Sequence, residues 1–564
     1  MLTMVMTGIA LLTLAGVLAY SAGTARLNYR SNQYRRAVAA AEGTTEKVVA
    51  MISQDYLSGG EVQVNANLAT YRQATLTTAD SSYWSDWEFN DASGNVGQTF
   101  VGVMPSSQYV VLNSPYAGLR GYASTYTLVS NARQTAAPQD VVGGVLQQLQ
   151  LSHIPIFQFA MYSSGDMEIS CGQPFTVTGR VHSNGQLYVE PSSSLTFQSD
   201  VTAVGNILYQ RNPLDSRPPP TGTVVYQGRE DSHVSAMTLP IGMSNSPTAI
   251  REIIQPPPPA ESPTSPLGRL RYFNLADMVL VVTNSGPNTG IIGSSGSFNG
   301  FVTVVPTNEL NLFVSTRTNF FDEREGKTVL PIDLNIAAFT AWSGTNSNLR
   351  VALASKPVSS IYVWDRRTLA GSNLGAVRLT QGTQLPALGL TVATASPLYV
   401  WGHYNQYNQT NLATANTSTT LPASLAADAI TVLSPNWSDA NSQAALASRT
   451  ATPVTVNAAL LAGAVETVQN YYGGGMENFP RFLESWGLAN PFTYNGSMVK
   501  MFPSLYATNA WGKANVYNPP ARNWAYDTNF DDPNKLPPLT PSVLKVLRSL
   551  WVTVSPNQTT PPAN

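Results

Sequence analysis

The chain begins with a long stretch that carries no charge. Residues 1–23 read MLTMVMTGIALLTLAGVLAYSAG, and the first charged side chain is that of Arg26. A helix needs about 20 apolar residues to cross a bilayer, and no proline interrupts this stretch. A cleaved secretion signal has a charged start and an apolar centre of about 7–15 residues, so that interpretation fits poorly. The sequence therefore predicts a helix that spans a membrane or packs against other helices.

The helical pattern continues beyond this apolar stretch. No proline occurs before Pro105, and Gly59 and Gly60 are a plausible end of the helix. One helix from about residue 2 to about residue 57 would be about 80 Å long, since each residue adds about 1.5 Å. The second half of this helix is predicted to be amphipathic, because apolar residues recur on one side at Ala37, Ala40, Ala41, Val48, Val49 and Ile52.

The segment IPIFQFAMYSSGDMEISCGQPFTVTGRVHSNGQLYV (residues 154–189) resembles a recurrent segment of large type IV pilin-like bacterial surface proteins, and residues 8–48 resemble the N-terminal segment of PilX-type minor pilins. The shared features are a leucine-rich apolar run, an exit of small residues, a basic stretch and the motif Ala40-Ala41-Glu42. The resemblance implies a structural subunit of an extracellular type IV pilus-like or pseudopilus filament, inserted in the inner membrane before assembly. Its partners would be copies of this chain or other pilin-like subunits, with the head exposed at the cell surface.

The resemblance also implies an interface between the helices of neighbouring subunits. Apolar side chains leave lipid and contact one another when such helices pack. Pilins typically carry a glutamate at the fifth position that helps to register the incoming subunit, and this chain has Val5 there. The residues expected at the helix-packing interface are Ile9, Leu11, Leu12, Leu14, Val17, Leu18, Val48, Val49 and Ile52.

Three other interpretations stay open. The chain could be a minor or tip pilin whose head acts as an adhesin or glycan-binding module. It could be the single-pass anchor of an unrelated surface protein. It could also be a membrane-tethered carbohydrate-active enzyme, which would need a cluster of carboxylates or basic groups on one face of its head. The basic residues after the apolar run favour a cytoplasmic head by the positive-inside rule, whereas the resemblance places the head outside.

The composition excludes some classes of partner. Charged residues make up 11% of the chain and the formal net charge is -2, so the chain lacks the basic surface that a nucleic-acid-binding protein needs. Hydrophobic residues make up 43%, which argues against disorder. We therefore expect a folded protein whose surface is mainly uncharged and polar, with surface glycans as candidate ligands and no nucleic acid.

A repeat of 20 residues marks the middle of the chain. VTGRVHSNGQLY (residues 177–188) aligns with FQSDVTAVGNIL (residues 197–208), so that Val181 matches Val201 and Leu187 matches Ile207. A fixed period with apolar positions in register is typical of a β-solenoid. The predicted fold class is α+β, mostly β: a long helix over 1–57, a connecting region over 58–150 and a solenoid-like head over 151–440. Two proline-rich excursions, 212–222 and 255–266, are expected to be exposed.

The last part, 441–564, is expected to be a small mixed region with two short helices. The run NAALLAGAVETVQNYYGG predicts a helix over 458–472, ended by glycines. The run TPSVLKVLRSLW predicts a second helix over 540–551, with Thr540 as N-cap and Pro541 at the first helical position.

The sequence offers little catalytic chemistry. It contains no nucleophile elbow, zinc-protease, phosphate-loop or Cys-x-x-Cys motif, and we expect no enzyme and no cofactor.

The aspartates of DTNFDD start with the spacing of a calcium loop, but Pro538 stands where the twelfth-position glutamate belongs, so an EF-hand is excluded. An irregular calcium site at Asp527, Asp531 and Asp532 is the alternative to turn-capping carboxylates. The charged residues of VWDRR (363–367) and Glu477 are expected to form internal salt bridges.

Overall fold

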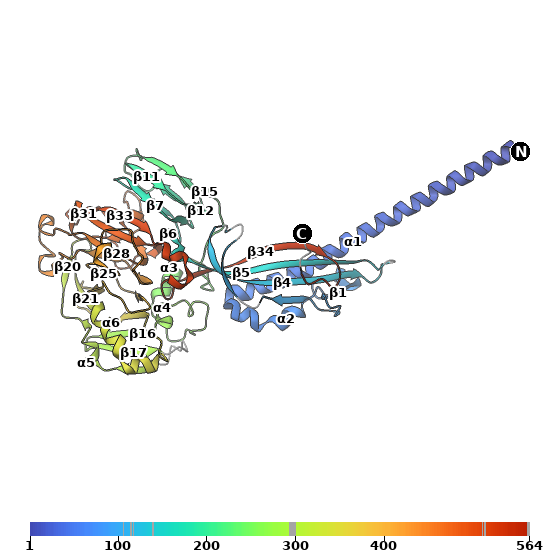
Figure 1. Cartoon of the computed structure of the whole chain (residues 1–564). Coiled ribbons are helices and arrows are strands. Elements are labelled where there is room, and N and C mark those ends of the chain that lie inside the picture. The colour runs from blue at the N-terminus through green and yellow to red at the C-terminus, as the bar shows by residue number, and fades with distance from the viewer. Residues whose placement is uncertain are drawn as a thin grey trace. The chain divides into compact units, whose positions relative to one another are not determined.

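A computed structural model describes residues 1–104, 107–112, 116, 118–137, 140–292, 301–509, 511–512 and 515–560, without the side chains of 288–292 and 301–304. The chain divides into two compact units. Unit 1 consists of Met1–Asn113, Gly121–Ile154 and Leu544–Asn564, and unit 2 of Ser114–Arg120 and Pro155–Val543. Unit 2 is therefore inserted into the sequence of unit 1. A long N-terminal helix and a large β-rich region are both present, as predicted (Figure 1).

Helix α1 (Leu2–Ala66) is longer than predicted. Its regular geometry breaks at Gly60, where φ is 65°, and helical structure then resumes as far as Ala66, before α2 (Leu68–Arg72). Glycine tolerates this left-handed conformation, so the predicted stop is a kink and not an end. Every residue from 1 to 32 is exposed, and burial begins at Gln33. The helix thus has a free apolar half and a packed half.

The packed half of α1 lies against an antiparallel sheet in unit 1. The strand order is β1-β4-β5-β34, and β2 and β3 also pair with β4. Apolar residues on one side of the helix contact one face of the sheet, in two clusters that contain Ala37, Ala40 and Ala41 in one and Val48, Val49, Ile52 and Tyr56 in the other. The strands are β1 (Trp87–Asn90), β2 (Phe100–Val103), β3 (Gln108–Val111), β4 (Arg120–Gln134), β5 (Val142–Pro155) and β34 (Ser542–Val554).

Strand β34 corrects the prediction of a helix over 540–551. The stripe Val543, Val546, Leu547 and Leu550 fits a helix, but the segment is also rich in β-branched residues and lies beside β5 at the edge of the sheet. The strand is favoured over the helix because it pairs with β5 and buries Leu544 in the core shared with α1. The C-terminal strand therefore completes the unit that the N-terminal helix begins.

Unit 2 is built mainly from parallel strands. Its largest sheet in the described part has 12 strands in the order β15-β12-β9-β6-β32-β29-β26-β24-β22-β16-β17-β18. Only the β16-β17-β18 pairs are antiparallel in this sheet. These strands are β15 (Glu230–Ser232), β12 (Val201–Ala203), β9 (Arg180–Ser183), β6 (Phe159–Ser163), β32 (Met498–Pro503), β29 (Ala459–Ala464), β26 (Ala423–Ala427), β24 (Leu390–Thr394), β22 (Ser360–Asp365), β16 (Met278–Thr283), β17 (Gly286–Ile292) and β18 (Phe301–Val305).

Further sheets of unit 2 are smaller. One has the order β19-β21-β23-β25-β27-β30, with β20 beside β21; it contains β19 (Val314–Ser315), β20 (Phe320–Asp322), β21 (Lys327–Asn335), β23 (Leu374–Thr380), β25 (Leu398–Trp401), β27 (Ile430–Leu433) and β30 (Pro480–Arg481). Three-stranded sheets join β13 (Ile207–Leu208), β10 (Leu187–Val189) and β7 (Met167–Ile169); β14 (Thr223–Tyr226), β11 (Ser194–Phe197) and β8 (Phe175–Val177); and β28 (Val454–Asn457), β31 (Ser485–Gly496) and β33 (Asn518–Tyr526).

The 20-residue repeat appears directly in the strand register. Val181 pairs with Val201 between β9 and β12, and Leu187 pairs with Ile207 between β10 and β13, all in parallel. The next repeat is longer, since Leu195 of β11 pairs with Val224 of β14. The proline-rich segment 212–222 accounts for the extra length. Part of it is buried, because Asn212 and Asp215 are 8% and 9% exposed, so this excursion is less exposed than predicted.

One continuous apolar core runs through unit 2 between its sheets. Stacked aliphatic positions such as Val392, Leu425 and Leu460 follow one another in register through β24, β26 and β29. Short helices lie in the connections: α3 (Pro247–Arg251), α4 (Tyr272–Leu275), α5 (Thr307–Leu310), α6 (Ile336–Thr345) and α7 (Ser347–Ala352).

The prediction of a helix over 458–472 is wrong. Residues 459–464 form β29, which pairs in parallel with β26 and β32 and is almost entirely buried. A short run that is apolar on all sides suits a strand covered on both faces as well as it suits a helix. Neither of the two helices expected in 441–564 occurs in the described residues of that region.

Candidate assembly interface and buried charge cluster

The free half of α1 presents an uncovered apolar surface. Its exposed side chains form the first part of the predicted interface, and each is more than half exposed: Ile9, Leu11, Leu12, Leu14, Val17 and Leu18. By length and composition this helix could cross a membrane. Apolar surface of this size favours transfer out of water, so a covering of lipid or protein would stabilise it.

The other three predicted interface residues lie elsewhere. Val48, Val49 and Ile52 are at most 5% exposed and pack beneath the sheet of unit 1. For these three the prediction is corrected: they attach α1 to its own subunit and present no surface to another. The second half of α1 is amphipathic, as predicted. The period of its apolar residues does not specify whether its own sheet or another subunit covers the apolar side.

Four arginines lie near the junction of the two halves of α1, two before Gln33 and two after it. Arg26, Arg30, Arg35 and Arg36 are all exposed, and none of them forms an ion pair with another described residue. Side chains of this kind can pair with lipid headgroups or with carboxylates of a neighbouring subunit. They mark the end of the apolar surface.

The three predicted calcium ligands have separate hydrogen-bond partners in the protein. Asp527 is buried and accepts from the Thr417 hydroxyl at 2.8 Å, while Asp531 lies 3.6 Å from a guanidinium nitrogen of Arg180. Asp532 accepts from the backbone N–H of Asn534 and caps a 3₁₀ turn. Within the described ranges, no group of three or more His, Cys, Asp or Glu side chains is arranged to hold a metal ion.

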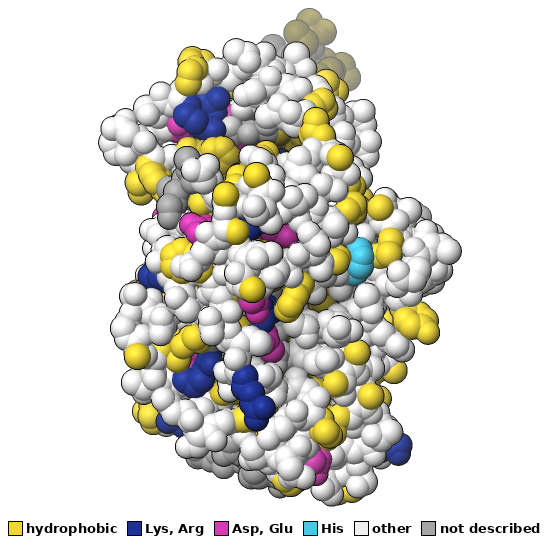
Figure 2. All heavy atoms as spheres, turned by 90° about the vertical axis from the view of Figure 1, so that its left-hand side faces the viewer, with side chains coloured by type: hydrophobic (Ala, Val, Ile, Leu, Met, Phe, Trp, Pro, Cys, Tyr) yellow, Lys and Arg dark blue, Asp and Glu magenta, His cyan; other side chains and the backbone are white. Residues whose placement is uncertain are grey.

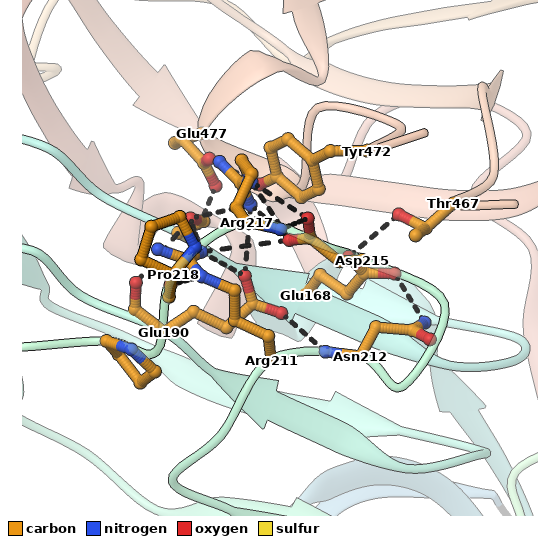
Figure 3. Close-up of polar contacts among 12 residues, drawn as sticks. Glu168, Glu190, Arg211, Asn212, Asp215, Arg217, Pro218, Thr467, Tyr472 and Glu477 are labelled. Atoms are coloured by element: carbon orange, nitrogen blue, oxygen red, sulfur yellow. Dashed lines mark hydrogen bonds and ion pairs between the residues drawn. The ribbon is translucent and has the colours of Figure 1, made fainter. Parts of the chain in front are cut away.

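A cluster of charged side chains that the sequence analysis missed lies in unit 2 (Figure 3). Glu190, which is fully buried, accepts from Arg211 at 3.0 Å, from Arg217 at 3.2 Å and from the backbone N–H of Asn212 at 3.0 Å. Arg217 also pairs with Asp215 at 2.7 Å. Asn212 and Arg217 belong to the proline-rich segment 212–222, and Arg211 directly precedes it, so this network holds the segment against β7 and the end of β10.

Two further carboxylates complete this charge cluster. Glu168 accepts from the Asn212 amide at 2.9 Å and from the Thr467 hydroxyl at 2.8 Å. Glu477 accepts from the Tyr472 hydroxyl at 2.7 Å and from a backbone N–H. Burial raises the pKa of both carboxyls. The available sequence signal was three charged residues within seven positions, Arg211, Asp215 and Arg217, in a chain with only 11% charged residues.

The expected internal salt bridge is present in the segment VWDRR, whereas Glu477 accepts hydrogen bonds and forms no ion pair with the described residues. Asp365 and Arg367 form an ion pair at 2.6 Å, and both side chains are 8% exposed.

The lone cysteine, Cys171, is buried, and burial together with the nearby Glu477 charge raises the pKa of its thiol to about 12. At neutral pH this thiol is protonated, and so it is a poor nucleophile.

The face drawn in Figure 2 matches the low content of charge. Lysine, arginine, aspartate and glutamate side chains occur singly or in small groups on a surface that is mostly uncharged. No continuous basic area, such as a nucleic-acid backbone requires, is seen on this face.

Comparison with known proteins gives little further guidance. No family model matches the chain, and no curated protein matches its sequence. Among solved structures, it is similar to the competence-associated pilin ComZ from Thermus thermophilus, over 93% of this chain and 98% of that one, with 11% identity and a TM-score of 0.30. This likeness is low in both sequence identity and structural superposition.

Proposed function

We propose that this chain is a structural subunit of a type IV pilus-like or pseudopilus filament, and not an enzyme. The observation that carries the proposal is the division of α1 into an exposed apolar half and a half fixed beneath the sheet of unit 1. A helix of this design can leave lipid and pack with other helices while its own unit stays folded. The stacked parallel strands of unit 2, which we interpret as a solenoid-like head, are then displayed at the cell surface.

The energetics support a covered helix. Burying one exposed leucine, isoleucine or valine side chain is worth about 1.5–3 kcal/mol, and the free half of α1 exposes nine such side chains, including the six predicted interface residues. In the membrane, lipid tails supply that cover before assembly. In a filament the helices of copies of this chain, or of other pilin-like subunits, replace the lipid.

Deletion of residues 1–25 tests the role of the free half. Packing of α1 begins after this point, at Gln33, so the truncated chain is expected to keep its fold and to be soluble and monomeric. Size-exclusion chromatography with light scattering measures the mass, and near-UV circular dichroism checks the fold. Filaments formed by the folded, truncated protein would disprove the proposal.

Cysteine cross-linking separates a filament from a simple membrane anchor. Because the thiol of Cys171 is buried, a Cys171→Ala background with Leu14→Cys gives one reactive thiol on the free half. In a filament, the helices of neighbouring copies are close enough for oxidation to give disulfide-linked dimers in sheared fibres. Val96→Cys, on an exposed loop of unit 1, is the matched control. If neither Leu14→Cys nor Val96→Cys gives disulfide-linked dimers, the result would favour a simple membrane anchor.

The size of unit 2 favours a minor or tip subunit as the second candidate. Packed helices lie about 8–10 Å apart, whereas a compact unit of roughly 390 residues has a radius of gyration of about 21 Å. If every subunit of a filament carried such a head, the heads would hold neighbouring helices farther apart than packed helices lie. Large gaps would then remain in the helical core of the filament. Gold labelling of the head on sheared fibres distinguishes the two arrangements: label at one end indicates a tip subunit, and label along the fibre indicates a major one.

A further inference from the structure

Unit 2 contains a cavity of about 780 Å³ formed by connections between its strands. It is lined by α6, α7 and the turn after α7, by residues 383–387 between β23 and β24, and by part of the long connection between β25 and β26. A volume of this size is typical of small-ligand sites. Connections carried on a rigid stack of strands are also the usual place for binding residues.

The charge of this cavity is unbalanced. The segments that line it, residues 340–358, 383–387 and 405–421, contain no aspartate or glutamate. They contain two cations, Arg350 and Lys356, and Lys356 is held by Asp277 at 2.7 Å. Arg350 is exposed, and its guanidinium makes no hydrogen bond or ion pair to any residue that the structure describes. One planar cation is therefore available to a carboxylate or sulfate, with no acidic lining residue to oppose it.

The other lining residues suit a sugar ring. Tyr407 is 67% exposed and offers an aromatic face beside the cavity. Thr383 and Gln384 carry polar groups without a side-chain hydrogen bond to other described residues, and Leu349 and Leu385 form a buried apolar floor. Aromatic faces pack against the C–H groups of a sugar, and hydroxyl and amide side chains bond its hydroxyls.

We propose that this cavity binds an acidic saccharide, with Arg350 pairing the anionic group and Tyr407 packing against the ring. A nucleic acid is disfavoured, because it would require several cations along its backbone and the cavity has one that is unpaired. The proposal does not depend on filament assembly, since every residue it uses lies in unit 2.

The test is a calorimetric titration of the full chain in a detergent without a sugar headgroup. The probe is tetragalacturonate, and its fully methyl-esterified form has the same rings without the charge. A carrageenan tetrasaccharide, which carries sulfate and no carboxylate, separates the two sources of negative charge. We expect tetragalacturonate or the sulfated probe to bind and the ester to bind at least tenfold more weakly, because the ester carries no anionic group for a charge-assisted hydrogen bond with Arg350.

Two variants locate the binding. Arg350→Gln and Tyr407→Ala alter exposed side chains, so both proteins are expected to fold, and each should weaken binding of the charged probe about tenfold or more. Arg317→Gln removes an exposed arginine that does not line the cavity and should leave binding unchanged. Equal binding of the charged and esterified probes, loss of binding in the Arg317 variant as well, or binding of single-stranded DNA alone would overturn the proposal.

Discussion

At the scale of single residues, Glu190 links the charge cluster to pH. Burial raises the pKa of its carboxyl to about 7, and the neighbouring charge of Glu168 adds to the rise, whereas the reference value is 4.5. Between pH 4.5 and about 7 the folded state therefore holds a proton that the unfolded chain has released. The contribution of this group to the free energy of unfolding is fully present below pH 4.5 and is lost as the pH rises through about 7.

Glu190→Gln is expected to remove this dependence. From pH 5 to pH 7, the free energy of unfolding of the natural protein should fall relative to that of the variant, by up to about 1.4 kcal/mol per pH unit. Denaturant titrations of both proteins at pH 5, 6, 7 and 8 measure the difference. Glu230→Gln, on the exposed strand β15, is the matched control. A constant difference across this range would show that Glu190 does not carry the effect.

Arg378 is a second residue with a measurable role. Its buried guanidinium pairs with Asp333 and with Asp439, each at 2.6 Å. Arg378→Leu leaves two carboxylates without their counter-ion, which should lower the free energy of unfolding by about 3–5 kcal/mol. The matched change Arg229→Leu removes a largely exposed partner of Asp200 and should cost at most about 1 kcal/mol. Similar losses in the two variants would contradict the importance of burial.

At the scale of elements, the contact between α1 and the sheet depends on Gly143 of β5. A Cβ atom there would lie 2.5 Å from the backbone nitrogen of Val38 and 2.8 Å from the carbonyl carbon of Ala37. Gly143→Ala should therefore lower the free energy of unfolding by about 1–3 kcal/mol through overpacking. Gly165→Ala, where a Cβ would have no neighbour within 4 Å, should change it by at most about 0.5 kcal/mol. Chemical denaturation compares the two, and an unaffected Gly143 variant would show that α1 can move away.

At the scale of the whole molecule, unit 1 is made from both ends of the sequence. Removing residues 542–564 deletes β34, takes Leu544 out of the core and breaks the ion pair of Arg548 with Glu46. We expect unit 1 to become sensitive to limited proteolysis while unit 2 stays resistant, as mass spectrometry of the fragments would show. Removing only 555–564 should change neither. Proteolysis of both units after the larger deletion would mean that they unfold together.

Much of the chain's organisation was predictable because it depends on local pattern. An uncharged apolar run, continued by an amphipathic stretch without proline, defined α1 up to its kink at Gly60. The 20-residue spacing defined the parallel register of Val181 with Val201 and of Leu187 with Ile207. In both cases a short segment is enough to recognise the structure, because a helical or repeat period is visible in residues that are close in the sequence.

Local sequence pattern was thus enough to predict a long N-terminal helix and a β-rich body with a repeat. The strand form of β29 and β34, the packing of Val48, Val49 and Ile52 against their own sheet, and the pairing of Glu190 with Arg211 and Arg217 became apparent in the folded chain. The folded chain also shows which connections surround the cavity of Arg350 and Tyr407. The physical reason is the same in each case: an apolar or charged side chain specifies that it must be covered or paired, while the partner that does so comes from a distant segment.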